Sequence, residues 1–114
     1  MPHLTLRHSS NLKDADFLPF FQKAHMVLCE LLNVKSSSCS SMVTPHQQYL
    51  IGDGEMHNAF VHLDVLVKAE RYTKELLKKA SQSLFNELSH YLALTDASQA
   101  KASVDVFETS YFSN

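Results

Sequence analysis

Glycine is nearly absent from this chain of 114 residues, and both copies lie in the tripeptide Gly52-Asp53-Gly54. Such a tripeptide is typical of a tight turn, and no other segment carries an equally clear turn signal. It separates two similar halves, about residues 1–51 and 55–110, each with the pattern of a strand, a helix and a second strand. A chain of this length suits one small domain, so we expect residues 1–114 to form a single domain.

The first half begins with the pattern of a half-buried strand. Leu4 and Leu6 alternate with polar neighbours, which is the period of two that such a strand requires. Apolar residues at steps of three and four then predict an amphipathic helix over about residues 17–33. Asp14 or Asp16 is the expected capping residue at its N-terminus.

A serine-rich loop and a weaker strand complete the first half. Residues 35–41 contain five serines and predict a polar loop. Residues 42–51 follow as the weaker strand. Proline cannot donate a backbone hydrogen bond, so Pro45 favours an edge position for this strand.

The second half opens with a more apolar strand over residues 58–67. Its odd positions are all apolar, and its even positions also include Phe60 and Leu66. We therefore expect both faces to be largely buried, as in a central strand. Thr73 is a candidate N-cap for the next helix, which we expect to end at Thr95-Asp96, before a last strand over about residues 102–107.

These elements predict an α/β (α+β) fold. Two β–α–β units form a four-stranded mixed sheet, and their two right-handed crossovers place both helices on one face. The second face of the sheet then lacks a cover within the chain. We expect another subunit to cover it, so the pattern predicts an oligomer.

Composition and charge argue against several classes of partner. Lysine and arginine number 10 and aspartate and glutamate 12, for a net charge of −2. A balance this close to neutral predicts no strong binding to nucleic acid or to anionic membranes. No apolar run approaches the roughly 20 residues of a membrane span, and no signal peptide is recognisable, so we expect a cytoplasmic protein. The two cysteines have neither zinc-site nor disulfide-framework spacing.

Four features together resemble the tautomerase superfamily, and most closely the 5-carboxymethyl-2-hydroxymuconate isomerases. The chain starts Met1-Pro2-His3-Leu4, as that family does, and Asp53-Gly54 is followed at the expected distance by the motif Ala59-Phe60-Val61-His62-Leu63. Arg71 then precedes the second helix, and the resemblance spans nearly the whole chain. The Met-Pro start is a weak motif alone, but it is fairly specific in combination with the distant Ala-Phe-Val-His motif.

The resemblance implies a homotrimer whose sheets pack around a central barrel. It also implies an isomerase of aromatic catabolism that uses no metal and no cofactor. Removal of Met1 would leave Pro2 as a free amine that acts as general acid and base. Such a group needs a pKa near the working pH, and an apolar pocket beside a cation disfavours the ammonium form.

The resemblance also assigns the groups that bind a substrate carboxylate. Arg71 would hold it through the planar, bidentate guanidinium; the alternative is a solvated arginine paired with Glu70 or Glu75. The family carries a second arginine in its second strand, but here that position falls on Ser40, in a stretch without arginine. One of the two cationic side chains that the resemblance implies for binding the substrate is therefore missing, unless Lys35 replaces it.

His62 and Asp64 lie two residues apart on one strand face and could mimic a pair of metal ligands. No third ligand is visible in the sequence, so we interpret them as partners in a structural hydrogen bond. The expected function is a cofactor-free isomerase of an unsaturated 2-hydroxy or 2-oxo acid. The alternatives are a weak or inactive trimeric binding protein of the same fold and a protein-interaction module that uses the polar helix faces.

Overall fold

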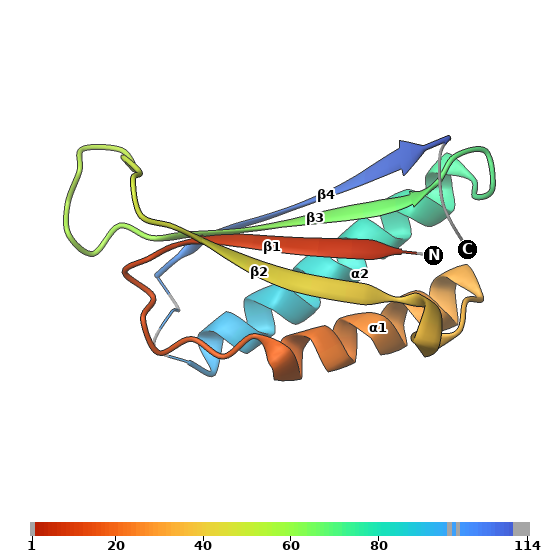
Figure 1. Cartoon of the computed structure of the whole chain (residues 1–114), viewed down its shortest axis with the longest axis horizontal. Coiled ribbons are helices and arrows are strands. Elements are labelled where there is room, and N and C mark those ends of the chain that lie inside the picture. The colour runs from red at the N-terminus through yellow and green to blue at the C-terminus, as the bar shows by residue number, and fades with distance from the viewer. Residues whose placement is uncertain (1, 96, 98, 111–114) are drawn as a thin grey trace.

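The computed structural model describes residues 2–95, 97 and 99–110. Met1 and Asp96, which the sequence analysis assigned to processing and to the end of the second helix, lie outside these residues. The described elements are the strand β1, the helix α1, the short 3₁₀ helix η1, the strands β2 and β3, the helix α2 and the strand β4 (Figure 1). Their bounds are His3–Ser9, Leu18–Leu32, Ser36–Ser38, Ser40–His46, Phe60–Lys68, Lys74–Ala93 and Lys101–Thr109.

The strands form one mixed sheet in the order β2-β1-β3-β4. β1 is parallel to β2 and antiparallel to β3, and β3 is parallel to β4. His3 lies opposite Ser40 of β2 and Leu66 of β3, and Leu66 lies opposite Phe107 of β4. The starts of β1 and β2 and the ends of β3 and β4 therefore share one end of the sheet, which we call the Pro2 end.

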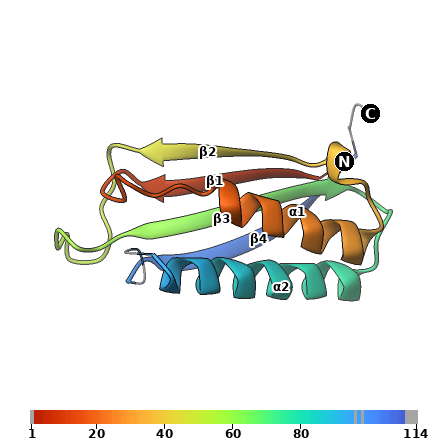
Figure 2. The same cartoon turned by 90° about the horizontal axis from the view of Figure 1, so that it is seen from below.

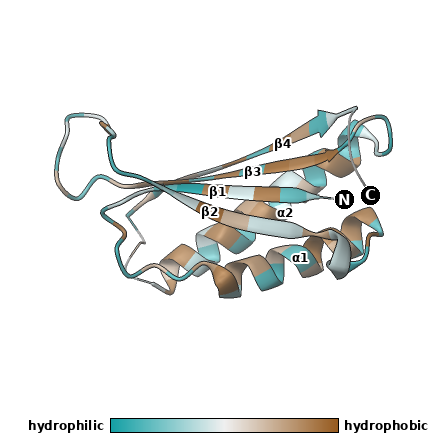
Figure 3. Ribbon diagram, in the orientation of Figure 1, coloured by the Kyte–Doolittle hydropathy of each residue, from teal (hydrophilic) through white to brown (hydrophobic). Residues whose placement is uncertain are grey.

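Both helices pack on the same face of the sheet, as the two β–α–β units predict (Figure 2). Strand side chains that point to this face are buried, including Leu4 and Leu6 of β1 and the odd-numbered residues of β3 from Val61 to Val67. The apolar character of β3 is also visible in Figure 3. The core consists mainly of these side chains and the inner stripes of α1 and α2, which include Phe20, Leu28, Leu84 and Leu88. Neither α1 nor α2 has the length and apolar character that a helix needs to cross a membrane.

The other face of the sheet is only partly buried within one chain. Leu66 is 37% exposed and Phe107 is 48% exposed, while His62 and Asp64 are half-buried. The expectation that both faces of this strand are largely buried is therefore wrong for the single chain, because no element of the described chain packs on this face. The centre of the open face, with His62 and Asp64, is also more polar than its ends, with Leu66 and Phe107.

The first helix begins without a side-chain cap at its N-cap residue, Phe17. Of the two predicted candidates it is Asp16 that contributes, since its carboxylate accepts a hydrogen bond of 3.1 Å from the Leu18 N–H. The prediction for the second helix is confirmed, because the Thr73 hydroxyl accepts a hydrogen bond from the Leu76 N–H at 3.1 Å.

The second strand differs from its prediction at both ends. β2 begins at Ser40 instead of residue 42, because the Ser40 N–H donates to the carbonyl of Pro2 and starts the ladder there. It ends at His46 instead of residue 51, because the chain then leaves the sheet and forms a long loop. The turn in this loop is confirmed, with a hydrogen bond from Gly54 to Ile51 and a positive φ of 58° at Gly52. The edge position that Pro45 predicts is also confirmed.

Candidate active site

Pro2 lies directly before β1 and is fully buried. Its carbonyl accepts a hydrogen bond of 3.1 Å from the backbone N–H of Ser40. This bond continues the parallel ladder of β1 and β2, in which His3 lies opposite Ser40. The sheet itself therefore holds Pro2 in place, and it brings Ser40 next to Pro2 across 38 positions of sequence.

The side chains of His3 and Ser40 also meet, through a hydrogen bond between the imidazole Nδ1 and the hydroxyl Oγ. Both residues are half-buried and lie on the face of the sheet that the helices leave open. The sequence analysis singled out Ser40 but assigned no role to His3. A parallel register between two strands is set by the packing of the whole β–α–β unit, so no local signal could have paired them.

Lys35 and Arg71 lie near the Pro2 end of the sheet, in the segments before β2 and after β3. Lys35 is exposed and directly precedes η1, and its carbonyl accepts a hydrogen bond from the N–H of Ser38, the last residue of η1. Arg71 is exposed in the turn after β3, where Glu70 adopts a positive φ of 62°. Its exposure agrees with the solvated arginine of the alternative interpretation, but the described residues show no ion pair of Arg71 with Glu70 or Glu75.

A polar network occupies the centre of the open face. The Arg7 guanidinium donates to Asp64 Oδ2 at 2.6 Å, and His62 Nε2 lies 2.7 Å from Asp64 Oδ1. The other ring nitrogen of His62 lies 2.6 Å from the hydroxyl of Ser103. The predicted hydrogen bond between His62 and Asp64 is therefore confirmed. Sequence reasoning missed Arg7, because only the antiparallel register places it opposite His62 and so within reach of Asp64.

The same network includes three residues with the spacing of a metal site. Ligand atoms of His62, Asp64 and Asp105 all lie within 4.8 Å of one another. Both ring nitrogens of His62 are already hydrogen-bonded, and the positive charge of Arg7 lies against Asp64. A metal at His62 would have to replace one of these two hydrogen bonds, and the neighbouring cation of Arg7 would repel it, so this arrangement suits a salt-bridged network better than a metal.

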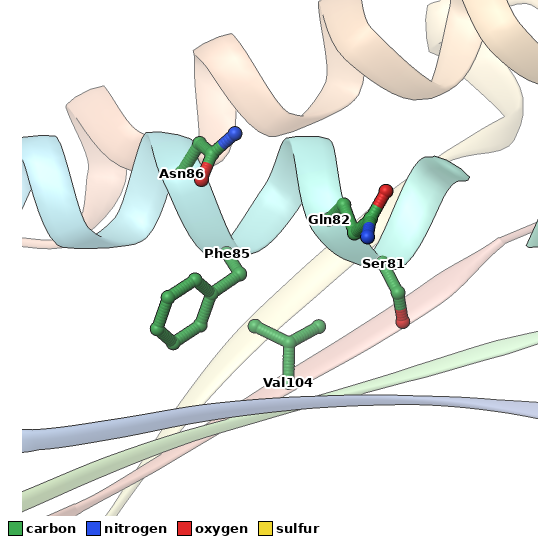
Figure 4. A pocket seen from close by; sticks show the side chains of 5 residues that line it. All are labelled: Ser81, Gln82, Phe85, Asn86 and Val104. Atoms are coloured by element: carbon green, nitrogen blue, oxygen red, sulfur yellow. The ribbon is translucent and has the colours of Figure 1, made fainter. Parts of the chain in front are cut away.

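Hollows on the surface of the described residues include two that Pro2 does not line. One, of about 490 Å³, lies between α2 and β4, and no titratable side chain lines it (Figure 4). The other, of about 330 Å³, lies on the open face next to the polar network and was not predicted. Its lining residues are Arg7, His46, Gln48, Tyr49, Phe60 and His62.

Cys39 directly precedes Ser40 and brings a thiol close to the Pro2 end. Burial and the neighbouring Cys29 thiol raise the pKa of Cys39 to about 11. At neutral pH this thiol is therefore protonated, and only a thiolate is a strong nucleophile. The Cys39 side chain is also half-buried.

Comparison with known proteins decides the family. The sequence model of the family described as 5-carboxymethyl-2-hydroxymuconate isomerase matches residues 2–111, nearly the whole chain. The chain belongs to the 5-carboxymethyl-2-hydroxymuconate isomerase family. A search of curated proteins finds no match to it.

Solved structures agree with membership of the 5-carboxymethyl-2-hydroxymuconate isomerase family. A 5-carboxymethyl-2-hydroxymuconate isomerase from Deinococcus radiodurans R1 is 26% identical, with a TM-score of 0.82 over 95% of this chain and 82% of that one. A 5-carboxymethyl-2-hydroxymuconate delta-isomerase is 17% identical, with a TM-score of 0.81 over 100% of this chain and 87% of that one. A structure described as a W0 fused 4-OT wild type symmetric trimer is 15% identical, with a TM-score of 0.70 over 93% of this chain and 85% of that one. The tautomerase-like fold is thereby established.

Proposed function

We propose that this chain is a cofactor-free isomerase that moves a proton on an unsaturated 2-hydroxy or 2-oxo acid. The observation that carries the proposal is the position of Pro2, buried and hydrogen-bonded at the start of β1 in a member of this family. After removal of Met1, the nitrogen of Pro2 would be a secondary amine. It would take a proton from one carbon or hydroxyl of the substrate and return it to another carbon, while the double bond moves.

The position of Pro2 favours this chemistry. One group must accept and then release the proton, so its pKa must lie near the working pH. A buried amine loses hydration of its charged form, which lowers the pKa of that amine. Arg71, exposed in the turn at the same end of the sheet, would bind the substrate carboxylate, and Lys35 could supply a second positive charge.

We further propose that the protein assembles as a homotrimer. The open face of the sheet carries half-buried and exposed apolar side chains at its ends, including Phe60 and Phe107. Apolar surface of this kind is stabilised when a second copy covers it. A relative with the same fold, 15% identical, is described as a symmetric trimer.

One observation favours a second candidate, a trimeric binding protein with little or no catalysis. Ser40 occupies the strand position where the family resemblance places an arginine, and its hydroxyl is already bonded to His3. Loss of a charge that holds substrate weakens both binding and rate. This candidate and the isomerase differ in whether Pro2 supports proton transfer.

A single set of measurements separates the two candidates. The intact mass of the protein purified from its native host establishes whether Met1 is removed. Proton exchange on a 2-hydroxydienoate is then followed for the processed protein, for Pro2→Ala and for a form that retains Met1. We expect activity in the processed protein, a partial loss in Pro2→Ala, which keeps a primary amine, and none in the Met1-retaining form. Equal exchange in all three proteins would contradict a role for Pro2.

A further inference from the structure

The pair formed by His3 and Ser40 has no role in the function proposed so far. We infer that this pair positions Pro2 and makes the adjacent end of the site select an uncharged substrate terminus. The inference rests on the proposed function, because it assigns a specificity to the same site. The substrate class that we infer is a 2-oxo acid that ends in a methyl group where a dicarboxylate has its second carboxylate.

The positioning role follows from how Ser40 is held. Its backbone N–H donates to the Pro2 carbonyl at 3.1 Å, and its hydroxyl bonds to His3, the residue after Pro2. Two hydrogen bonds therefore connect one residue of β2 to two consecutive residues of β1. Rotation of the first peptide of β1 would break one or both of them, so the direction of the Pro2 nitrogen depends on this connection.

The specificity follows from the charge of the side chains beside Pro2. The Ser40 hydroxyl is uncharged, and it is already engaged with His3. Across β1, His3 lies opposite Leu66, an apolar residue that is 37% exposed. Neither the engaged Ser40 hydroxyl nor the Leu66 side chain carries a charge to offset the water that a second carboxylate would lose here, whereas an alkyl end would contact the apolar Leu66.

Two substrates test this choice directly. 2-Oxohexanoate and 2-oxoadipate have the same number of carbons and differ only in a terminal methyl group or carboxylate. In deuterated water, the base removes a hydrogen from C3 and returns a deuteron, so proton NMR follows the exchange. We expect kcat/KM to favour 2-oxohexanoate in the unsubstituted protein.

Variants at Ser40 separate positioning from specificity. Ser40→Arg should shift the kcat/KM ratio toward 2-oxoadipate by about 10- to 150-fold, the range of a charge-assisted contact. Ser40→Ala should lower kcat for both substrates without changing their ratio, and Ser40→Thr, which keeps the hydroxyl, should restore the rate. Gln22→Arg adds the same charge on the exposed surface of α1 and is the matched control.

His3 gives an independent test of the pair. His3→Asn keeps a polar atom near the position of Nδ1, whereas His3→Leu does not. Exchange should therefore be retained better in His3→Asn, with melting temperatures of both variants measured to exclude unfolding.

The outcomes distinguish the inference from the proposed function. Exchange that depends on Pro2 but favours 2-oxoadipate in the unsubstituted protein, or a ratio that Ser40→Arg leaves unchanged, would overturn the inference alone. Absence of exchange with every substrate would overturn the proposed function. In that case NMR titration still tests the specificity. The unsubstituted protein should bind 2-oxohexanoate with the lower dissociation constant, and Ser40→Arg should shift the preference toward 2-oxoadipate.

Discussion

Arg71 brings a full positive charge to the turn after β3, and no carboxylate of the described residues lies within ion-pair distance of it. If it binds the substrate carboxylate, Arg71→Ala should lower kcat/KM for a 2-hydroxydienoate by about 10- to 150-fold. Its melting temperature should stay the same, because the side chain is exposed. Arg71→Lys should recover only part of the loss, since it lacks the planar fork. Lys79→Ala on the exposed side of α2 is the control, and an unchanged kcat/KM in Arg71→Ala would exclude Arg71 as the anchor.

A second single residue, His25, should make the stability of the protein depend on pH. Its Nε2 lies 2.6 Å from the Ser41 hydroxyl, and burial lowers the pKa of His25 below its ordinary value of 6.5. The unfolded chain then binds a proton at a higher pH than the folded chain does. The contribution of His25 to stability is therefore fully present above about pH 6.5 and is lost as the pH falls through the pKa of His25 in the folded state.

Replacement of His25 by glutamine removes this titration. We expect the free energy of unfolding to fall less steeply between pH 7 and pH 5 in His25→Gln than in the unsubstituted protein. Urea denaturation at one fixed protein concentration measures both slopes. His57→Gln, in the exposed loop after β2, is the control and should keep the original slope. Identical slopes for His25→Gln and the unsubstituted protein would show that another group dominates.

Among the elements, α2 has the better-defined beginning. The Thr73 hydroxyl accepts a hydrogen bond from the Leu76 N–H. Glu75 places a negative charge in the first turn, where it interacts favourably with the positive end of the helix dipole. Thr73→Ala should destabilise the protein by about 1 kcal/mol, the usual effect of losing such a cap, while Thr73→Ser should retain most of the stability. Chemical denaturation compares the two variants, and equal midpoints for alanine and serine would mean that the cap contributes nothing.

At the scale of the whole molecule, the open face of the sheet is the feature that predicts assembly. Light scattering in dilute solution should give about three times the chain mass of 12.9 kDa. A well-folded monomer at micromolar concentration would contradict this architecture, because its apolar side chains would then be exposed to water.

One substitution in the polar network tests the interface without touching Pro2. His62 lies 2.7 Å from a carboxylate oxygen of Asp64 and 3.6 Å from one of Asp105. His62→Glu would place a third negative charge between them and should shift the assembly toward monomers at a given concentration. His62→Gln keeps a polar side chain without the charge and should dissociate less. Equal masses for both variants and the unsubstituted protein would place the interface elsewhere.

The sequence by itself determined the elements, their order and the family. Alternation at Leu4 and Leu6, the helical stripes and the Gly52-Asp53-Gly54 turn are local patterns, and local patterns reflect the periods of strands and helices. The features that identify the family, from Pro2 near the start of the chain to Arg71 before the second helix, could also be recognised in the sequence alone. Only the tertiary structure decided which residues meet across strands: His3 with Ser40, and Arg7 with Asp64. Register depends on how the helices pack on the sheet, and a shift by one residue would place each of these side chains on the opposite face.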